Sequence, residues 1–271
     1  MRGYVDTSVG QVHYRQEGGS GPDVVLLHCA NFSSNLFSRA LPLLGEHVRA
    51  WAFDAPGVGL SDGPATPSHT ALAGYLLEAI DALGITAPTL GGLHTGARLA
   101  LEMSRQRGAD AFPALVLSGM GPVTPALETS INAPHLLLHP EVDGSEWDKA
   151  RARYYTLFPS QDPPTEDGAW LQHYYLTASM DKLVPNRLPW PGPSVAGYEL
   201  RSVFESFPNP ILLLNTPEDC FSGVDYEAVG WNPNATLDML EGIGSHLMLR
   251  DPHAYAEHLL AFLRDRKILE Q

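Results

Sequence analysis

The segment LGGLHTGARLALE, residues 90–102, constrains the fold more than any other part of the sequence. It reads as the end of a strand, a glycine-rich sharp turn and the start of a helix. His94 stands at the turn, with Gly92 and Gly96 two residues to either side. A tight strand-to-helix turn requires small neighbours at this spacing and points the central side chain into solvent or substrate. We therefore expect His94 to project into a pocket, because a plain helix-start residue would leave both glycines without a use.

Apolar runs on both sides of this turn alternate with helical patterns, which indicates an α/β protein. Buried strands are predicted at 23–29, 48–54, 87–94, 114–121, 210–219 and 235–242. Continuous apolar strands separated by helices predict a mostly parallel central sheet covered by helices on both faces. Residues 11–18 alternate in polarity and are predicted to form an antiparallel edge strand. The last helix is expected to begin with Asp251 as its N-cap and Pro252 in its first turn.

Residues 122–208 are too many for a simple connection between two strands, and they are predicted to form an inserted, mainly helical lid. The ranges 1–121 and 209–271 then form the core. Ligands of open α/β sheets bind at the carboxyl ends of the strands, which such a lid would cover. Aromatic residues of the lid either line this pocket or simply pack the lid onto the core. The candidates for the pocket are Trp147, Tyr154, Trp170, Tyr174 and Trp190.

The charge balance limits the partners of this chain. It carries 31 acidic and 17 basic residues, for a net charge of −14, which disfavours binding to nucleic acid and to anionic membranes. The N-terminus has no apolar run typical of a signal peptide, and no segment is long and apolar enough to span a bilayer. Two cysteines are too few for a disulfide framework and suit a reducing compartment. We expect a soluble cytoplasmic protein, a monomer or homodimer, that acts on a small molecule.

Five motifs follow one another in a characteristic order. They are LLHCANFSSNLF (26–37), FDAPGVGLSD (53–62), GGLHTG (91–96), NTPEDC (215–220) and GIGSHLMLRDP (242–252). With these motifs the chain resembles the α/β-hydrolase superfamily over nearly its whole length. The resemblance implies the α/β-hydrolase fold and three catalytic positions: His94 in place of the nucleophilic serine, Asp219 as the acid and His246 as the catalytic histidine. It also implies that Asp219 orients His246.

The loop after the first buried strand departs from the family pattern, because Cys29 follows His28 where glycine is usual. The resemblance implies that backbone N–H groups of Ala30 and Thr95 form the oxyanion hole, and Asn31 adds a possible amide donor. His28 is expected to bond the loop backbone. Cys29 is a candidate for the substrate site and, as an alternative, for a displaced nucleophile, although the sequence places no base beside it. A disulfide between Cys29 and Cys220 is not expected.

No cofactor is predicted. The chain has no P-loop, and GGLHTG lacks the glycine spacing of a dinucleotide site. His94, His246 and Asp219 are a conceivable metal-binding set of two histidines and one carboxylate. We expect no metal, however, because the resemblance places Asp219 behind His246 and leaves too few ligands.

Three functions are consistent with a histidine at the turn. In the first, His94 attacks an activated ester, or a related acyl or C–C bond, and His246 then activates water. In the second, His94 and the His246–Asp219 pair act as general acid and base in a lyase, cyclase, isomerase or cofactor-free oxygenase. In the third, the protein binds a small molecule and has no catalytic activity. We favour an enzyme, and hydrolysis over the other reactions, with a small and largely apolar carbonyl substrate.

Overall fold

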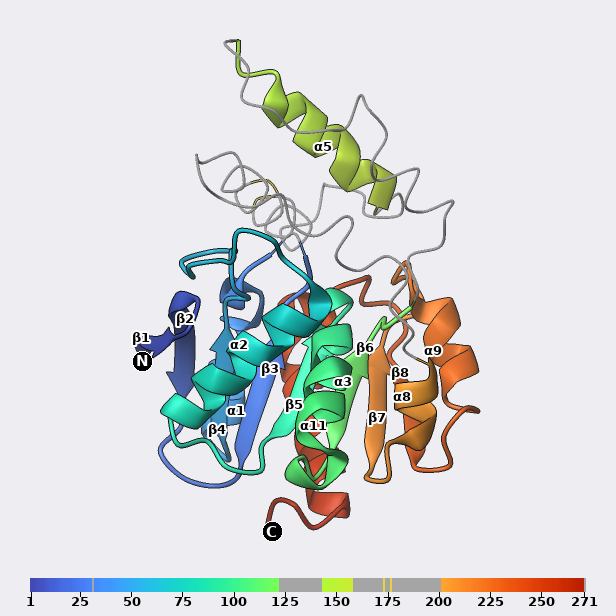
Figure 1. Cartoon of the computed structure of the whole chain (residues 1–271). Coiled ribbons are helices and arrows are strands. Elements are labelled where there is room, and N and C mark those ends of the chain that lie inside the picture. The colour runs from blue at the N-terminus through green and yellow to red at the C-terminus, as the bar shows by residue number, and fades with distance from the viewer. Residues whose placement is uncertain (31, 122–142, 158–172, 174–175, 177–200, 271) are drawn as a thin grey trace.

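An eight-stranded sheet forms the centre of the protein (Figure 1). The computed structural model describes residues 1–30, 32–121, 143–157, 173, 176 and 201–270. The strand order is β1-β2-β4-β3-β5-β6-β7-β8. The strands are β1 (Arg2–Thr7), β2 (Gly10–Glu17), β3 (Asp23–Leu27), β4 (Arg49–Phe53), β5 (Thr89–Leu93), β6 (Leu115–Ser118), β7 (Ile211–Asn215) and β8 (Ala235–Met239).

The six strands from β3 to β8 run parallel, and β2 is antiparallel to both of its neighbours, β1 and β4, which agrees with the predicted mostly parallel sheet. The predicted alternating strand is β2, but it is not the edge of the sheet. It lies between β4 and β1, a strand that the sequence pattern did not predict. Every residue of β3, β5, β6 and β7 is buried, which explains their continuous apolar sequences.

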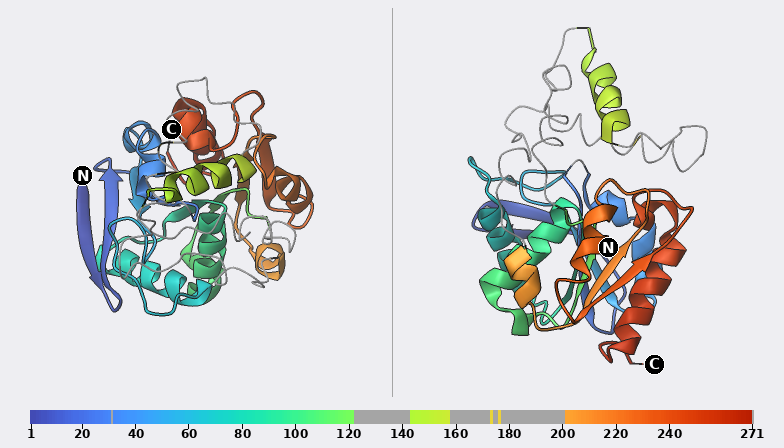
Figure 2. Two further views of the ribbon diagram at one scale, coloured as in Figure 1. Left: turned by 90° about the horizontal axis from the view of Figure 1, so that it is seen from above. Right: turned by 90° about the vertical axis from the view of Figure 1, so that its right-hand side faces the viewer.

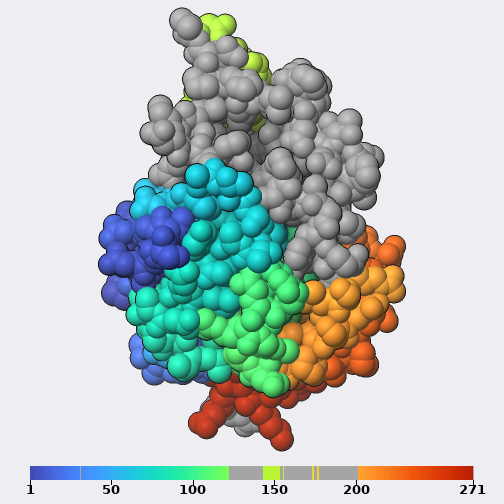
Figure 3. Space-filling model, viewed as in Figure 1, coloured from blue at the N-terminus to red at the C-terminus, as the bar shows by residue number. Residues whose placement is uncertain are grey.

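Helices cover both faces of the sheet (Figures 1 and 2). On one face, α2, α3 and α8 contribute to a hydrophobic cluster, and α2 and α3 form a continuous surface in the space-filling view (Figure 3). On the other face, α1, α10 and α11 pack into a second cluster. The helices are α1 (Ala40–Gly45), α2 (His69–Ala82), α3 (Thr95–Arg107), α5 (Glu146–Leu157), α8 (Arg201–Ser206), α9 (Ser222–Ala228), α10 (Leu247–Arg250) and α11 (Pro252–Asp265), with short 3-10 turns at Ser34–Phe37 and Ala109–Ala111.

Helix ends follow local sequence signals. Asp251 caps α11 by accepting a hydrogen bond from the Ala254 backbone, and Pro252 opens the helix, as predicted. Ser68 caps α2 by accepting from the Ala71 backbone. In the described part of the chain, no helix is both long enough and apolar enough to cross a membrane.

The connection between β6 and β7 contains the predicted lid, of which two helices are described. Helix α5 lies beyond the carboxyl ends of the parallel strands (Figure 1). Helix α8 packs against the core instead, and Phe204 on it is fully buried in the cluster with α2 and α3. The end of the predicted lid, at helix α8, is therefore packed against the core.

The carboxylate of Asp54 ties the loop after β4 to two other segments. Its Oδ1 accepts a hydrogen bond from the Ser34 backbone at 2.6 Å, and its Oδ2 accepts one from the Leu60 backbone at 2.9 Å. The His13 ring on β2 lies 3.0 Å from Oδ2. Burial alone would raise the pKa of Asp54, but the bond to His13, the nearby His28 and the backbone donors lower this pKa to about 2.

Replacement of Asp54 by Asn should destabilise the protein in a pH-dependent way. Because the folded pKa of about 2 lies below the ordinary pKa of 3.8, the stabilisation is present above the unfolded pKa and is lost as the pH falls through the folded pKa. We expect Asp54→Asn to lower the free energy of unfolding by about 2 kcal/mol at pH 7 and by much less near the folded pKa. Denaturant titrations at both pH values measure these losses of stability. The control is Asp110→Asn at an exposed position. An equal loss of stability at both pH values would show that the negative charge of Asp54 is not what stabilises the fold.

Candidate active site

His94 occupies the turn between β5 and α3, as predicted. Its backbone has φ 50° and ψ −107°, a conformation that non-glycine residues rarely adopt. The His94 N–H donates to the Ser118 carbonyl at 2.9 Å, and the His94 carbonyl accepts from the Arg98 N–H at 3.2 Å. The end of β6 and the first turn of α3 therefore hold this strained residue in place.

The two flanking glycines are required by close backbone approach. A Cβ atom on Gly92 would lie 2.3 Å from the carbonyl carbon of Gly96. A Cβ atom on Gly96 would lie 2.0 Å from the Leu27 carbonyl oxygen on β3. Neither space can hold a methyl group, so the turn forms only with glycine at both positions.

The carboxylate of Asp219 binds His94. The Nε2 atom of His94 lies 3.0 Å from Oδ1 and 2.9 Å from Oδ2 of Asp219, which follows β7. The expectation that Asp219 pairs with His246 is therefore wrong in this structure. A carboxylate can only accept hydrogen bonds, so Nε2 of His94 carries a proton, and in the neutral ring the lone pair is on Nδ1.

Asp219 remains ionised despite its burial. Its side chain is 0% exposed, whereas that of His94 is 11% exposed. Burial alone would raise the pKa of Asp219, but the charge and hydrogen bond of His94 lower it, and the N–H of Phe221 donates to Oδ1 at 2.9 Å. The net effect is a pKa below the ordinary value. Asp219 thus fixes both the orientation and the tautomer of His94.

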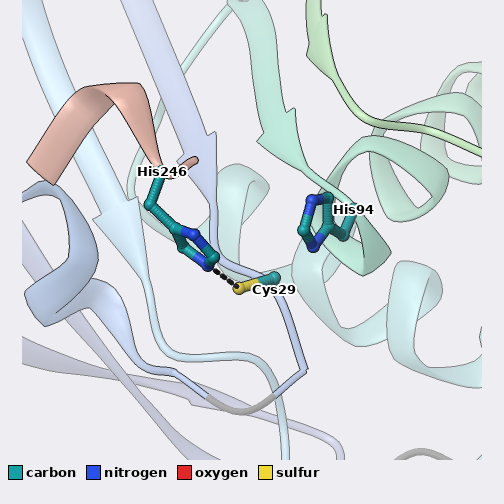
Figure 4. Close-up of side chains that lie close together, drawn as sticks. All are labelled: Cys29, His94 and His246. Carbon is teal, nitrogen blue, oxygen red and sulfur yellow. Dashed lines mark hydrogen bonds between the residues drawn. The ribbon is translucent and has the colours of Figure 1, made fainter. Parts of the chain in front are cut away.

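His246 faces Cys29 instead of Asp219 (Figure 4). Its Nε2 lies 3.8 Å from Cys29 Sγ, and its Nδ1 lies 3.0 Å from Ser245 Oγ. The expectation that Cys29 has no base beside it is therefore wrong, because the fold brings together two residues that are 217 positions apart. His246 also has a left-handed backbone, with φ 62° and ψ 52°.

The His246 imidazole is held in its neutral form. The residue is 0% exposed. Burial is the main cause that lowers the pKa of His246 to about 3, and the nearby charge of His94 lowers it further. The rings of His94 and His246 lie 5.6 Å apart between centroids, nearly perpendicular to one another. Phe221 packs edge-on against His94 at 4.7 Å, and Phe32 packs against His246 at 5.0 Å. The two imidazoles thus lie side by side between aromatic rings.

The loop after β3 is held by His28, as expected. One ring nitrogen of His28 lies 2.7 Å from the Cys29 carbonyl, and the other accepts from the Ala55 backbone at 2.9 Å. Ala30 directly follows Cys29, and Thr95 is the first residue of α3. Their role as oxyanion donors stays a prediction. Asn31 lies outside the described residues.

The aromatic candidates of the lid receive little support. Trp147 on α5 is 44% exposed. Tyr154 belongs to α5, but its side chain is not described, and Trp170, Tyr174 and Trp190 lie outside the described residues. Cys220 is exposed, and neither Cys29 nor Cys220 is in a disulfide.

Sequence reasoning missed two residues that shape the site, Gly119 and Asp225. Gly119 has φ 57°, and a Cβ there would lie 2.6 Å from His94 Cδ2 and 2.8 Å from Asp219 Oδ1. The buried Asp225 accepts from the Gly119 backbone at 2.8 Å and from Asn215 Nδ2 at 2.7 Å. Burial raises the Asp225 pKa to about 6. A glycine directly after a predicted strand was the available signal for Gly119.

Residues 24–258 match the model of the alpha/beta hydrolase family. Two curated relatives are zearalenone hydrolases, one from Cladophialophora bantiana that is 28% identical over 126 residues and one from Bionectria ochroleuca that is 31% identical over 106 residues. The alignments cover 44% and 35% of this chain. They cover 46% and 39% of the relatives, so the chain spans less than half the length of each relative that it matches.

Several solved structures share the fold. A thermophilic esterase from Thermogutta terrifontis is 18% identical with a TM-score of 0.78. The alignment covers 98% of this chain and 99% of the esterase chain. A carboxylesterase from Bacillus subtilis is 19% identical with a TM-score of 0.79, at 97% and 91% coverage. An enol-lactonase from Burkholderia xenovorans is 17% identical with a TM-score of 0.73, at 96% and 99% coverage. At these identities the likeness concerns the fold alone.

A methyl group at position 119 should disrupt the pair of His94 and Asp219. We expect Gly119→Ala to lower the free energy of unfolding by about 1–3 kcal/mol beyond the backbone cost, because the added Cβ overlaps both side chains. Gly84→Ala is the matched control, since Gly84 has a similar φ of 66° and a Cβ atom there would meet nothing within 4 Å. Denaturant titrations of both variants measure the difference. Equal losses would show that the His94–Asp219 pair does not depend on the space above Gly119.

Proposed function

Because this chain belongs to the alpha/beta hydrolase family, we propose that it hydrolyses the ester or lactone bond of a small, largely apolar compound. The observation that carries the proposal is the bond between the Asp219 carboxylate and His94 at the position of the family's nucleophile. Names of relatives and structural neighbours, which include zearalenone hydrolases, esterases and an enol-lactonase, support a carbonyl substrate.

In this proposal His94 is the general base. Asp219 keeps the proton on Nε2, so the lone pair of Nδ1 is available to take a proton from water. The water oxygen attacks the carbonyl carbon, and the negative charge on the carbonyl oxygen is stabilised by the N–H groups of Ala30 and Thr95. The intermediate then expels the alkoxide, which receives the proton from Nδ1. His94 returns to its starting state, and no covalent enzyme intermediate forms.

The electrostatics of His246 favour this route over direct attack by His94. An acyl-imidazole on His94 would need a second base to activate water, and the family resemblance assigns this role to His246, whose ring centroid lies 5.6 Å from that of His94. Its pKa of about 3 makes His246 a poor base at neutral pH, and Asp219 does not orient it. Direct attack by water on the substrate uses only the base that Asp219 supports.

Asp219→Asn should lower kcat on activated aryl esters and lactones by about 10²–10⁴-fold, because an amide neither selects the Nε2–H tautomer nor stabilises the imidazolium. His94→Ala should show a loss of the same size, since both changes remove the same base. Initial rates with a panel of activated esters and lactones measure these losses.

The control is Asp238→Asn, which breaks a surface Asp–His pair in which His258 Nδ1 lies 2.9 Å from Asp238 Oδ2. We expect this variant to keep the full rate. Full activity in His94→Ala would overturn the role of His94, and a wild-type protein that is inert on the whole panel would overturn ester and lactone hydrolysis.

A further inference from the structure

We infer that Cys29, His94 and His246 form a binding site for one divalent metal ion of the zinc type. One potential ligand atom from each of these residues lies within 4.8 Å of the other two. Figure 4 shows the two imidazoles on either side of the Cys29 sulfur. The three residues come from the loop after β3, the turn after β5 and the loop before α10.

The separation of sulfur and nitrogen suits tetrahedral coordination. Zinc binds sulfur at about 2.3 Å and imidazole nitrogen at about 2.0–2.1 Å, so two such ligands lie about 3.5 Å apart in a tetrahedron. Cys29 Sγ and His246 Nε2 are 3.8 Å apart. This distance is long for a hydrogen bond, but an ion would bring the two atoms together by only a few tenths of an ångström.

Both imidazoles already have the supporting partners that metal-binding histidines need. A ligating histidine almost always bonds through its other ring nitrogen to a carboxylate, carbonyl or similar group, which fixes the ring. Asp219 serves His94 in this way at Nε2, leaving Nδ1 as the ligand atom. Ser245 Oγ lies 3.0 Å from Nδ1 of His246, and its Nε2 is turned toward Cys29.

The chemistry of the set points to zinc or cobalt rather than magnesium or calcium. A thiolate and two imidazoles are soft or intermediate ligands, whereas the hard cations require oxygen. Cys29 is 4% exposed and His246 is 0% exposed, so a cation would compensate the charge of a buried thiolate. The partly exposed His94 leaves the fourth position for water or a carbonyl oxygen.

A second combination, His94 with Asp219 and Cys220, is geometrically possible but less suitable. Both Asp219 oxygens already accept hydrogen bonds from His94, and Oδ1 also accepts one from Phe221. Cys220 is exposed. The set that contains Cys29 therefore leaves Asp219 in its supporting role.

The metal site deepens the proposed function, because it concerns the same His94, but metal binding does not require the reaction. With an ion bound, Nδ1 of His94 would be a ligand and no longer a base. The ion would instead lower the pKa of a bound water, which would release its proton to solvent. The two proposals are separable because metal binding is measured without substrate. Failure to bind metal would leave hydrolysis by His94 intact, and failure to hydrolyse esters would leave the metal site intact.

The test is a titration of the chelator-treated, reduced 271-residue chain with Co²⁺, followed by displacement with Zn²⁺. We expect one ion per chain, intense visible bands of tetrahedral cobalt and a sulfur-to-cobalt charge-transfer band in the near ultraviolet. Cys29→Ser should abolish the charge-transfer band, and His246→Ala should weaken Zn²⁺ binding at least 10-fold. Asp219→Asn, which changes only a supporting partner, should weaken it by about 10–100-fold.

Cys220→Ser is the matched control and should retain the charge-transfer band and the affinity. Circular dichroism of Cys29→Ser before titration establishes that the variant is folded. Absence of stoichiometric Co²⁺ binding to the wild type would overturn the inference. So would a charge-transfer band that survives in Cys29→Ser and disappears in Cys220→Ser.

Discussion

The hydrogen bond between the Asp219 carboxylate and the His94 ring is the interaction on which the site depends. It joins the loop after β7 to the turn after β5, and both Asp219 oxygens lie within 3.0 Å of Nε2. Gly119 leaves the space that the pair occupies, and Asp225 holds the backbone of Gly119. Because Asp219 is bound to His94, His246 is left to pair with Cys29. The chemistry of the site therefore follows from which imidazole the carboxylate selects.

The fold was predictable because its signals are local. Buried strands have continuous apolar sequences, and the glycines at 92 and 96 are required by backbone contacts at the turn. The capping of α11 by Asp251 likewise follows from adjacent residues. At the antiparallel edge of the sheet only β2 was predictable. Strand β1 has no strong alternation of polar and apolar residues, and it forms by pairing with β2.

The partners within the site were not predictable in the same way. The positions of His94, Asp219 and His246 follow from the motifs, but the motifs do not tell which histidine the carboxylate approaches. That choice depends on side chains 125 positions apart in the sequence and on the absence of a side chain at Gly119. The contact between Cys29 and His246 joins residues even farther apart. The proposed metal site does not follow from the sequence either, because the family resemblance places Asp219 behind His246 and no local signal joins Cys29 to the two histidines.

The most direct test of the central claim is proton NMR of the low-field ring N–H groups of the histidines, in the ion-free protein. A ring proton held by a buried carboxylate exchanges slowly and resonates far downfield. If Asp219 holds the ring of His94, a resonance disappears in both His94→Ala and Asp219→Asn and persists in His246→Ala. A resonance that persists in His94→Ala but disappears in His246→Ala and Asp219→Asn would contradict this prediction, because Asp219 would then hold His246.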